Sequence, residues 1–211
     1  MTMAYEKTYL RAILKTARQT MPAALAAELS REVQSRLLES GLFDAFPTIV
    51  LYAAVGNEVS TDALMRRAAS SAKSVLLARL RAGSAELELA RVRDFAGLVP
   101  GAFGIPEPPP GAEVVAPEAL GRCLVVAPGV AFSVRGERLG RGGGHYDRLL
   151  AKLDSQAITV GLAYSFQLLD SVPQSGHDRR LGFVITESAV YPSIHAPRPD
   201  GSIWNQGGTT R

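Results

Sequence analysis

A run of glycines flanked by arginines is the stretch whose residue types most directly suggest chemistry. Residues 136–148 read GERLGRGGGHYDR, and the core of the run contains Gly140, Gly142, Gly143 and Gly144. Glycine adopts positive φ easily and has no Cβ, so successive N–H groups of such a loop can converge on one anion. The cations Arg138, Arg141 and Arg148 add positive charge. We therefore expect this loop to bind an anion, most naturally a phosphate.

Two carboxylates stand where they could act on such a ligand. Asp147 lies three residues after the last glycine, and an acid beside a phosphate is repelled unless a cation lies between them. A bridging Mg²⁺ explains this position, and a carboxylate that only favours a helix start is the alternative. Glu58 lies at a strand-to-helix junction, where open α/β sheets bind ligands, although a surface or capping role is equally open.

The surroundings of the loop favour a binding role but exclude the best-known nucleotide motifs. A strand-like run at 123–127 precedes it, and a helical pattern of leucines at 149, 150 and 153 follows. No Lys-Ser/Thr pair closes the loop as in a Walker A motif, and His145 stands where a dinucleotide fingerprint has its third glycine. A flexible glycine-rich surface loop is the remaining alternative.

A helix over residues 4–19 supplies further cations. Leu10, with its apolar neighbours, belongs to one stripe, whereas Lys7 and Arg11 lie one turn apart on a basic stripe that continues through Lys15 and Arg18. Two like charges at i and i+4 repel each other unless an anion covers them. We therefore expect either a phosphate contact at Lys7 and Arg11 or a solvated basic face.

The remaining pattern alternates helices with short apolar strands. A second helix is expected over 23–40, and strands are expected at 48–55, 74–80, 86–92, 123–127, 157–163 and 183–186. The proline-rich stretch 100–117 can be neither helix nor central strand. The alternation predicts an α/β layered fold with a mostly parallel sheet. We expect one α/β catalytic domain over 1–188 and an irregular tail over 189–211.

Bulk composition limits the partners and the compartment. The chain has 211 residues and a net charge of +3, without any block of like charge, so binding of nucleic acid or membrane is weakly supported. A small anionic substrate fits the charge as well. The single cysteine, Cys123, lies in an apolar strand pattern, and no apolar segment reads as a signal peptide or membrane span. We expect a soluble cytoplasmic protein.

Five ordered motifs together resemble the 5-formyltetrahydrofolate cyclo-ligase family, also called methenyltetrahydrofolate synthetases, from about residue 7 to 187. They are Lys7-x-x-Leu10-Arg11, the strand that leads to Glu58-Val59-x-Thr61, Pro128-Gly129-x-Ala131-Phe132, Arg138-Leu139-Gly140-x-Gly142-x-Gly144-x-Tyr146-Asp147, and the closing pairs His177-Asp178 and Thr186-Glu187. Five motifs at matching separations form a specific signal.

The resemblance implies a three-layer α/β/α fold of the NagB/RpiA/CoA-transferase type. It also implies an ATP- and Mg²⁺-dependent ring closure of 5-formyltetrahydrofolate, with or without a polyglutamate tail, to 5,10-methenyltetrahydrofolate, with release of ADP and phosphate. A formamide oxygen leaves poorly, so this chemistry phosphorylates it before N10 attacks. The protein then needs to position the reactants and stabilise charge, without a covalent intermediate of its own. A monomer or weak homodimer is expected.

The same resemblance implies roles for individual residues. Catalysis is expected from Arg138, Arg141, Tyr146 and Asp147, and the metal from Asp147 and Asp178. The expected ATP contacts are Lys7, Leu10, Arg11, Arg138, Leu139, Gly140, Arg141, Gly142, Gly143, Gly144, His145 and Tyr146. The expected folate contacts are Ala53, Glu58, Phe132, Arg141, Gly142, Gly143, Gly144 and His145. A glutamate suits the pterin because two near-parallel hydrogen bonds can join them.

Three positions depart from the family's pattern, which usually has Tyr at 145, Asp at 133 and an acid at 182, where this chain has His145, Ser133 and Gly182. They leave open a catalytically silent relative that binds folate or a nucleotide. A sugar-phosphate or CoA enzyme is a second alternative, but it gives no reason for metal-poised carboxylates. An RNA-binding module lacks interleaved aromatics, and a Ser-His-Asp hydrolase lacks the Gly-x-Ser-x-Gly elbow.

Overall fold

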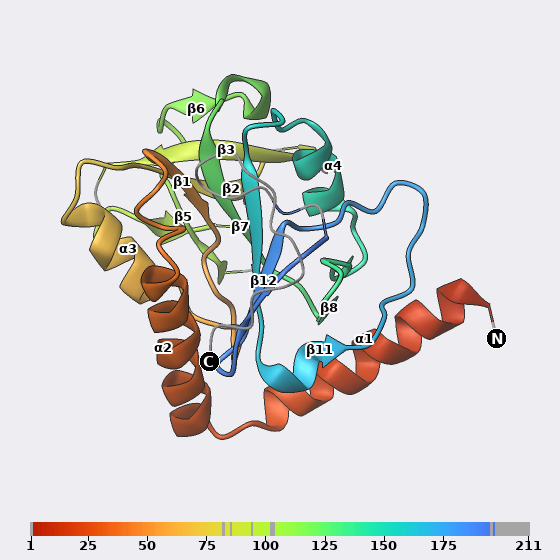
Figure 1. Ribbon diagram of the computed structural model, residues 1–211. Helices are drawn as coiled ribbons and strands as arrows, with labels where there is room; N and C mark the ends of the chain where they lie inside the picture. Colours follow the sequence, from red (N-terminus) through yellow and green to blue (C-terminus); the bar gives the residue numbers. More distant parts are fainter. Residues whose placement is uncertain are drawn as a thin grey trace.

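An eight-stranded sheet forms the centre of the computed structural model, which describes residues 2–81, 83–84, 86–93, 95–101, 104–194 and 196. Its strand order is β13-β12-β10-β7-β1-β2-β3-β6 (Figure 1). The strands are β1 (Thr48–Leu51), β2 (Ser74–Leu80), β3 (Leu87–Val92), β6 (Val114–Val115), β7 (Cys123–Ala127), β10 (Ile158–Leu162), β12 (Phe183–Ile185) and β13 (Val190–Pro192).

The middle of the sheet is parallel and its edges are antiparallel. Strands β12, β10, β7, β1 and β2 run parallel to their neighbours, whereas β3, β6 and β13 pair antiparallel. All five residues of β7 are buried, because this strand lies in the middle of a sheet covered on both faces. The prediction of an α/β fold with a mostly parallel sheet is confirmed.

Different layers cover the two faces of the sheet. Helices α2 (Ala23–Glu39) and α3 (Asp62–Ala69) cover one face, where Val33, Leu37 and Leu64 join the larger core. Helix α4 (His145–Ala151) covers the other face together with Phe132. The layer on this face therefore consists of one helix and part of a second, small sheet.

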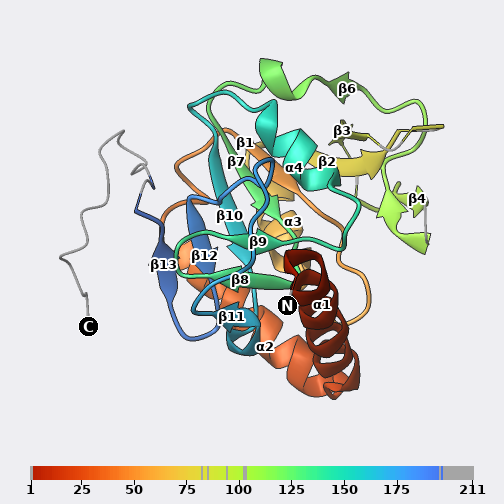
Figure 2. The ribbon, with the colours of Figure 1, turned by 90° about the vertical axis from the view of Figure 1, so that its right-hand side faces the viewer.

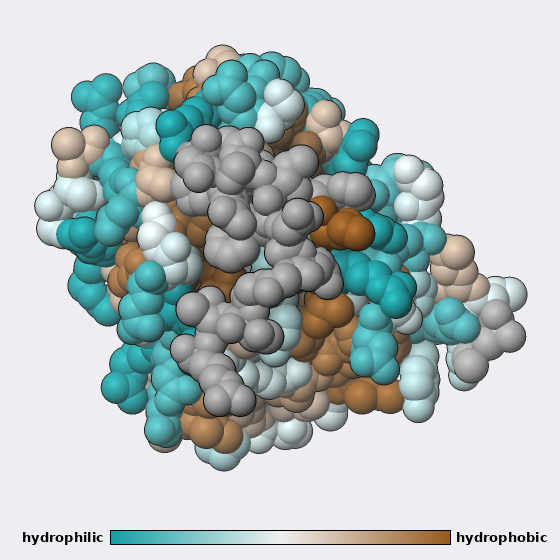
Figure 3. Space-filling model, in the orientation of Figure 1, coloured by the Kyte–Doolittle hydropathy of each residue, from teal (hydrophilic) through white to brown (hydrophobic). Residues whose placement is uncertain are grey.

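A small second sheet carries the N-terminal helix. Its order is β11-β8-β9, with β8 (Ala131–Ser133), β9 (Arg138–Leu139) and β11 (Leu168–Leu169). Helix α1 (Met3–Thr20) packs Leu14 against this sheet, in front of which it lies in Figure 2. Hydrophobic surface gathers where β11 lies near α1 (Figure 3). Because β9 leads straight into the glycine loop, this small sheet fixes both the helix and the loop.

The structure corrects several sequence-based expectations. The expected strands at 48–55, 74–80, 86–92, 123–127, 157–163 and 183–186 are all present, although most are shorter. The hairpin β8–β9 stands between the strand at 123–127 and the glycine loop, where no element was expected. The proline-rich stretch contributes short strands, β4 (Val99–Pro100), β5 (Pro106–Glu107) and β6.

The C-terminal segment also differs from its prediction. The expectation of an irregular chain from 189 onward is wrong for β13, which pairs with β12 because its tyrosine and valine fit the edge of the sheet. Residues 195 and 197–211 of that tail lie outside the described residues. Within the described part of the chain, no helix is long and apolar enough to cross a membrane.

Candidate active site

Two cavities meet at the glycine loop. The first has a volume of about 440 Å³ and is rich in cations. Its lining comprises Lys7, Arg11, Arg138, Leu139, Gly140, Gly142, Gly144, Asp147, Arg148, Ala151, Ser175, His177, Asp178 and Arg179. Such a lining suits a polyanion.

The second cavity, of about 380 Å³, is more apolar. It is lined by Tyr52, Ala53, Val55, Glu58, Ala78, Arg79, Leu80, Leu87, Ile105, Glu107, Pro128, Gly129, Arg138, Gly140, Arg141, Gly143, Gly144, His145, Tyr146 and Asp147. Arg138, Gly140, Gly144 and Asp147 line both cavities. The loop is therefore a shared wall, across which ligands in the two cavities would meet.

The backbone of the loop requires glycine at two positions. Gly142 has φ +114° and Gly144 has φ +63°, a region that strains other residues. Arg11 Nε donates a hydrogen bond of 2.9 Å to the carbonyl oxygen of Gly140, which fastens α1 to the loop. No acceptor among the described residues takes the N–H groups of Gly142, Gly143 and Gly144. These donors stay available to an anion in the cavities.

Arg138 is the buried cation of the shared wall. Its side chain is 2% exposed, and its Nη2 donates to Asp147 Oδ1 over 2.8 Å while Nη1 donates to the Pro128 carbonyl oxygen over 3.1 Å. Its Nε is buried without a hydrogen-bond partner in the described structure. Its guanidinium lies over the ring of Tyr146, whose pKa is raised chiefly by burial. Tyr146 therefore stays protonated at neutral pH.

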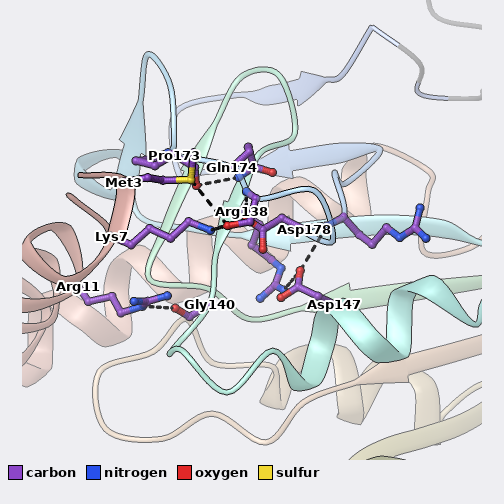
Figure 4. A network of polar contacts seen from close by, with 11 residues as sticks. Met3, Lys7, Arg11, Arg138, Gly140, Asp147, Pro173, Gln174 and Asp178 are labelled. Carbon is purple, nitrogen blue, oxygen red and sulfur yellow. Dashed lines mark hydrogen bonds and ion pairs between the residues drawn. The ribbon is translucent and has the colours of Figure 1, made fainter. Parts of the chain in front are cut away.

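Lys7 and Asp178 line the first cavity and contact each other (Figure 4). Lys7 Nζ lies 2.5 Å from Asp178 Oδ2 and also donates to Ser175 Oγ over 2.8 Å. Burial alone would raise the pKa of Asp178, but hydrogen bonds from Lys7 and the Ser175 N–H outweigh it and hold that pKa below its usual range. Figure 4 shows this pair beside Asp147 and Arg138.

The two predicted metal ligands line the same cavity and fit a magnesium ion. Asp147 Oδ1 and Asp178 Oδ2 accept the hydrogen bonds described for these carboxylates, and the other oxygen of each accepts none from a described residue. Among the described residues no group of three His, Cys, Asp or Glu side chains could hold a metal by itself. Mg²⁺ is commonly held by one or two carboxylates together with phosphates, so these residues suit Mg²⁺ bound with a nucleotide.

Glu58 is the buried carboxylate of the second cavity. Its side chain is 6% exposed, and Oε1 lies 2.5 Å from Arg141 Nη2 and 3.3 Å from Arg18 Nη1. Its Oε2 accepts the N–H of Val55 over 3.1 Å. The cavity therefore offers one oriented anionic acceptor among apolar walls, which suits a flat ring with N–H donors.

The structure divides the predicted site residues between the cavities. Lys7, Arg11, Leu139 and Gly142 line the first, whereas Ala53, Glu58, Arg141, Gly143, His145 and Tyr146 line the second. Leu10 lines neither and packs instead beside the core under α1. Phe132 needs a correction as a folate contact, because its ring is fully buried and covers Gly129 and Gly161.

Sequence reasoning missed Arg18 as part of this arrangement. It was placed in the basic stripe of the helix without a role, yet its guanidinium reaches Glu58. Its spacing of seven residues from Arg11 puts both on one helix face, which is the signal that could have found it.

The three departures from the family pattern lie in different places. His145 lines the second cavity, where its Nδ1 lies 3.1 Å from Arg148 Nη2. Ser133 is fully buried in the hairpin, where its hydroxyl donates to Glu137 Oε2 over 2.9 Å. Gly182 donates its N–H to Thr159 Oγ1. Ser133 and Gly182 line neither cavity, so His145 is the departure that bears on the ligands.

Fold and site together define an α/β protein that brings a cation-rich cavity and a more apolar cavity to one glycine loop. The sequence profile of the 5-formyltetrahydrofolate cyclo-ligase family matches residues 3–187, and the chain belongs to this family.

Curated relatives and solved structures agree with that assignment. The chain is 32% identical over 184 residues to 5-formyltetrahydrofolate cyclo-ligase of Mycolicibacterium smegmatis, covering 85% of this chain and 93% of that protein. It is 29% identical over 190 residues to a probable 5-formyltetrahydrofolate cyclo-ligase of Caenorhabditis elegans, covering 86% and 92%. The NMR structure of Aquifex aeolicus 5,10-methenyltetrahydrofolate synthetase matches with a TM-score of 0.77 and 31% identity, covering 97% and 99%.

Proposed function

We propose that the protein closes the ring of 5-formyltetrahydrofolate to give 5,10-methenyltetrahydrofolate, and converts ATP to ADP and phosphate in doing so. The observation that supports this most directly is the shared wall, because Arg138, Gly140, Gly144 and Asp147 line both the cation-rich and the apolar cavity. A reaction that joins a phosphate donor to a ring substrate needs such adjoining sites.

The chemistry follows from a poor leaving group. The formyl oxygen attacks the γ-phosphorus of ATP, and the bond from that phosphorus to the bridging oxygen of ADP breaks. N10 of the folate then attacks the activated formyl carbon, a C–N bond forms, the C–O bond breaks to release phosphate, and the proton of N10 is lost to the departing phosphate or to water. No protein atom becomes covalent, so the protein contributes position and charge stabilisation.

The first cavity suits the triphosphate. Lys7 and Arg11 face it from α1, and the unpaired N–H groups of the loop add neutral donors. Arg138 stands between the cavities, where charge develops on the transferred phosphoryl group. Its guanidinium is fixed by Asp147 and the Pro128 carbonyl, which suits stabilisation of that charge without reorganisation.

The second cavity suits the pterin. Glu58 would accept N–H donors of the ring, and Ala53 and His145 would lie against its faces and edge. Mg²⁺, when bound, would neutralise phosphate charge, and Asp147 and Asp178 are the residues that would hold it. Tyr146 keeps its proton and can donate a hydrogen bond, but it cannot serve as a base at neutral pH.

The test is to incubate the protein with 5-formyltetrahydrofolate and MgATP and to follow the strong near-ultraviolet absorbance of the methenyl product. We expect product to form with ATP and none to form without it, with one ADP released per ring closed. Binding of folate without product would support the catalytically silent alternative, which no observation of the site favours.

Finer properties extend the same proposal. The NagB/RpiA/CoA-transferase type of fold is supported by the parallel sheet with helices on both faces. A polyglutamate tail on the folate, a monomer or weak homodimer, and a single catalytic domain over 1–188 remain proposals. A cytoplasmic location is supported by the one buried free thiol, Cys123.

A further inference from the structure

Arg18 is a buried cation in the last turn of α1, seven residues after Arg11, which contacts the glycine loop. It is 8% exposed, although arginine is rarely buried without a partner. Its described ion pair is with Glu58, at 3.3 Å between Nη1 and Oε1. Burying a guanidinium is costly unless it is paired, so this side chain is held where it can act on that carboxylate.

The backbone at the end of α1 holds the same loop. Asn57 Nδ2 donates to the carbonyl oxygens of Arg18, over 3.0 Å, and Met21, over 2.8 Å. The Val55 N–H donates to the second oxygen of Glu58. The helix end therefore fixes residues 55–58 through a side chain and through its terminal carbonyls.

The two arginines that contact Glu58 differ in environment. Arg141 is on the glycine loop with a side chain 52% exposed, whereas the Arg18 side chain is 10% exposed and comes from a helix. Both reach the same oxygen, Oε1. The Arg141 pair is partly buried, with its arginine open to solvent, whereas both side chains of the Arg18 pair are buried, and breaking a buried pair is costly.

We infer that Arg18 is a positioning residue for the pterin-binding carboxylate: it holds Glu58 in place while Arg141 gives way to the N–H donors of the substrate ring. The inference rests on the proposed function and adds a residue that acts through Glu58. Lys7, Arg11 and Arg18 follow at spacings of four and seven residues, so they lie on one face of α1. One helix thereby serves both cavities.

Three variants test this role. Arg18→Met removes the charge and keeps much of the apolar stem, Arg18→Lys keeps the charge, and Lys15→Met is the matched control at an exposed position of the same helix. We expect Arg18→Met to raise the KM for 5-formyltetrahydrofolate about 10-fold and to leave the KM for ATP within about 2-fold. Arg18→Lys should recover part of the loss, and Lys15→Met should match the unaltered protein.

A double-mutant cycle shows whether Arg18 acts through Glu58. In a Glu58→Gln background, Arg18→Met should change the folate KM by less than about 2-fold, because the carboxylate it positions is gone. An unchanged folate KM in the single variant, or the same 10-fold rise in both backgrounds, would overturn the inference. So would an equal rise in both KM values.

Hydrogen exchange of the ligand-free protein separates this inference from the proposed function. Exchange across residues 52–61 should become faster in Arg18→Met and stay unchanged in Lys15→Met. If the unaltered protein forms no methenyl product, the proposed function fails, and this measurement alone decides the positioning role. Unchanged exchange in Arg18→Met would then overturn it.

Discussion

The two cavities present charge to a ligand in different ways. The first offers many cations and loop N–H groups, so a triphosphate bound there would make several contacts, and no single group would carry most of the binding. The second is lined by Glu58, Glu107 and Asp147, of which Glu58 is buried and has its two oxygens fixed by two arginines and a backbone N–H. Under the proposed function, phosphate binding is distributed over many groups, whereas ring recognition is concentrated in one oriented carboxylate.

Asp147 belongs to both cavities, and its loss should have the largest effect. Asp147→Asn keeps an oxygen that can accept from Arg138 but removes the charge. We expect turnover to fall by about two to three orders of magnitude, with a raised Mg²⁺ requirement. Methenyl formation over a Mg²⁺ series measures this, and Asp154→Asn on an exposed turn serves as the control. Near-normal turnover at limiting Mg²⁺ would leave Asp147 without a metal role.

Glu58 tests the second cavity, where we expect one carboxylate to carry most of the ring recognition. Glu58→Gln should raise the KM for 5-formyltetrahydrofolate roughly 10- to 100-fold, because a hydrogen bond to a charged group is worth about 1.5 to 3 kcal/mol. The KM for ATP should change little, since Glu58 lines only the second cavity. Steady-state kinetics with each substrate varied in turn supplies both values. A variant that loses ATP affinity equally would erase the distinction between the cavities.

Lys7 tests the first cavity, where phosphate contacts are shared among several groups, and its removal should weaken ATP binding by a smaller factor. Lys7→Ala removes one cation among several, so we expect the KM for ATP to rise about 10-fold, near the lower end of the range for a charged hydrogen bond. The folate KM should stay within about 2-fold. Lys15→Ala, on the same helix and exposed, is the matched control. An unchanged KM for ATP would show that Lys7 is a solvated residue of the helix surface and not an ATP contact.

The smallest effect concerns stability in acid. The pKa of Asp178 is lower in the folded protein than in the unfolded chain, so its contribution to stability is present above the unfolded pKa, about 3.9. That contribution is lost as pH falls through the lower folded pKa. Asp178→Asn should therefore lower the melting temperature slightly at pH 6, and the difference should vanish near pH 2. Parallel curves at every pH would contradict the Lys7–Asp178 contribution.

Local signals carried most of the prediction. The glycine spacing at 140–144 and the apolar runs of β7 and β10 were readable because backbone freedom and burial leave direct marks in sequence. The hairpin β8–β9 was not, because its strands have two or three residues and are buried against α1 instead of alternating with solvent. Phe132 resembled a ligand contact by its motif, and only tertiary packing shows that its ring fills space over Gly161.

The pairing of Arg18 with Glu58 was unreadable for a different reason. The two residues are forty positions apart, and nothing in either local pattern states how α1 lies against the loop after β1. The small sheet fixes that placement through Leu14, Val130 and Leu139. Long-range packing, which sequence patterns encode weakly, decides which carboxylate a helix cation meets.

The β8–β9 hairpin also limits which residues can stand at position 133, because Ser133 is buried against Glu137. Glu137, 4% exposed, accepts hydrogen bonds from Ser133, from the Val172 N–H and from Arg180. The family's usual aspartate, restored alone by Ser133→Asp, would face the Glu137 carboxylate in a buried place, and like charges there repel. The neutral hydroxyl of Ser133 therefore suits the Glu137 carboxylate, and a change of charge at either position would be felt at the other.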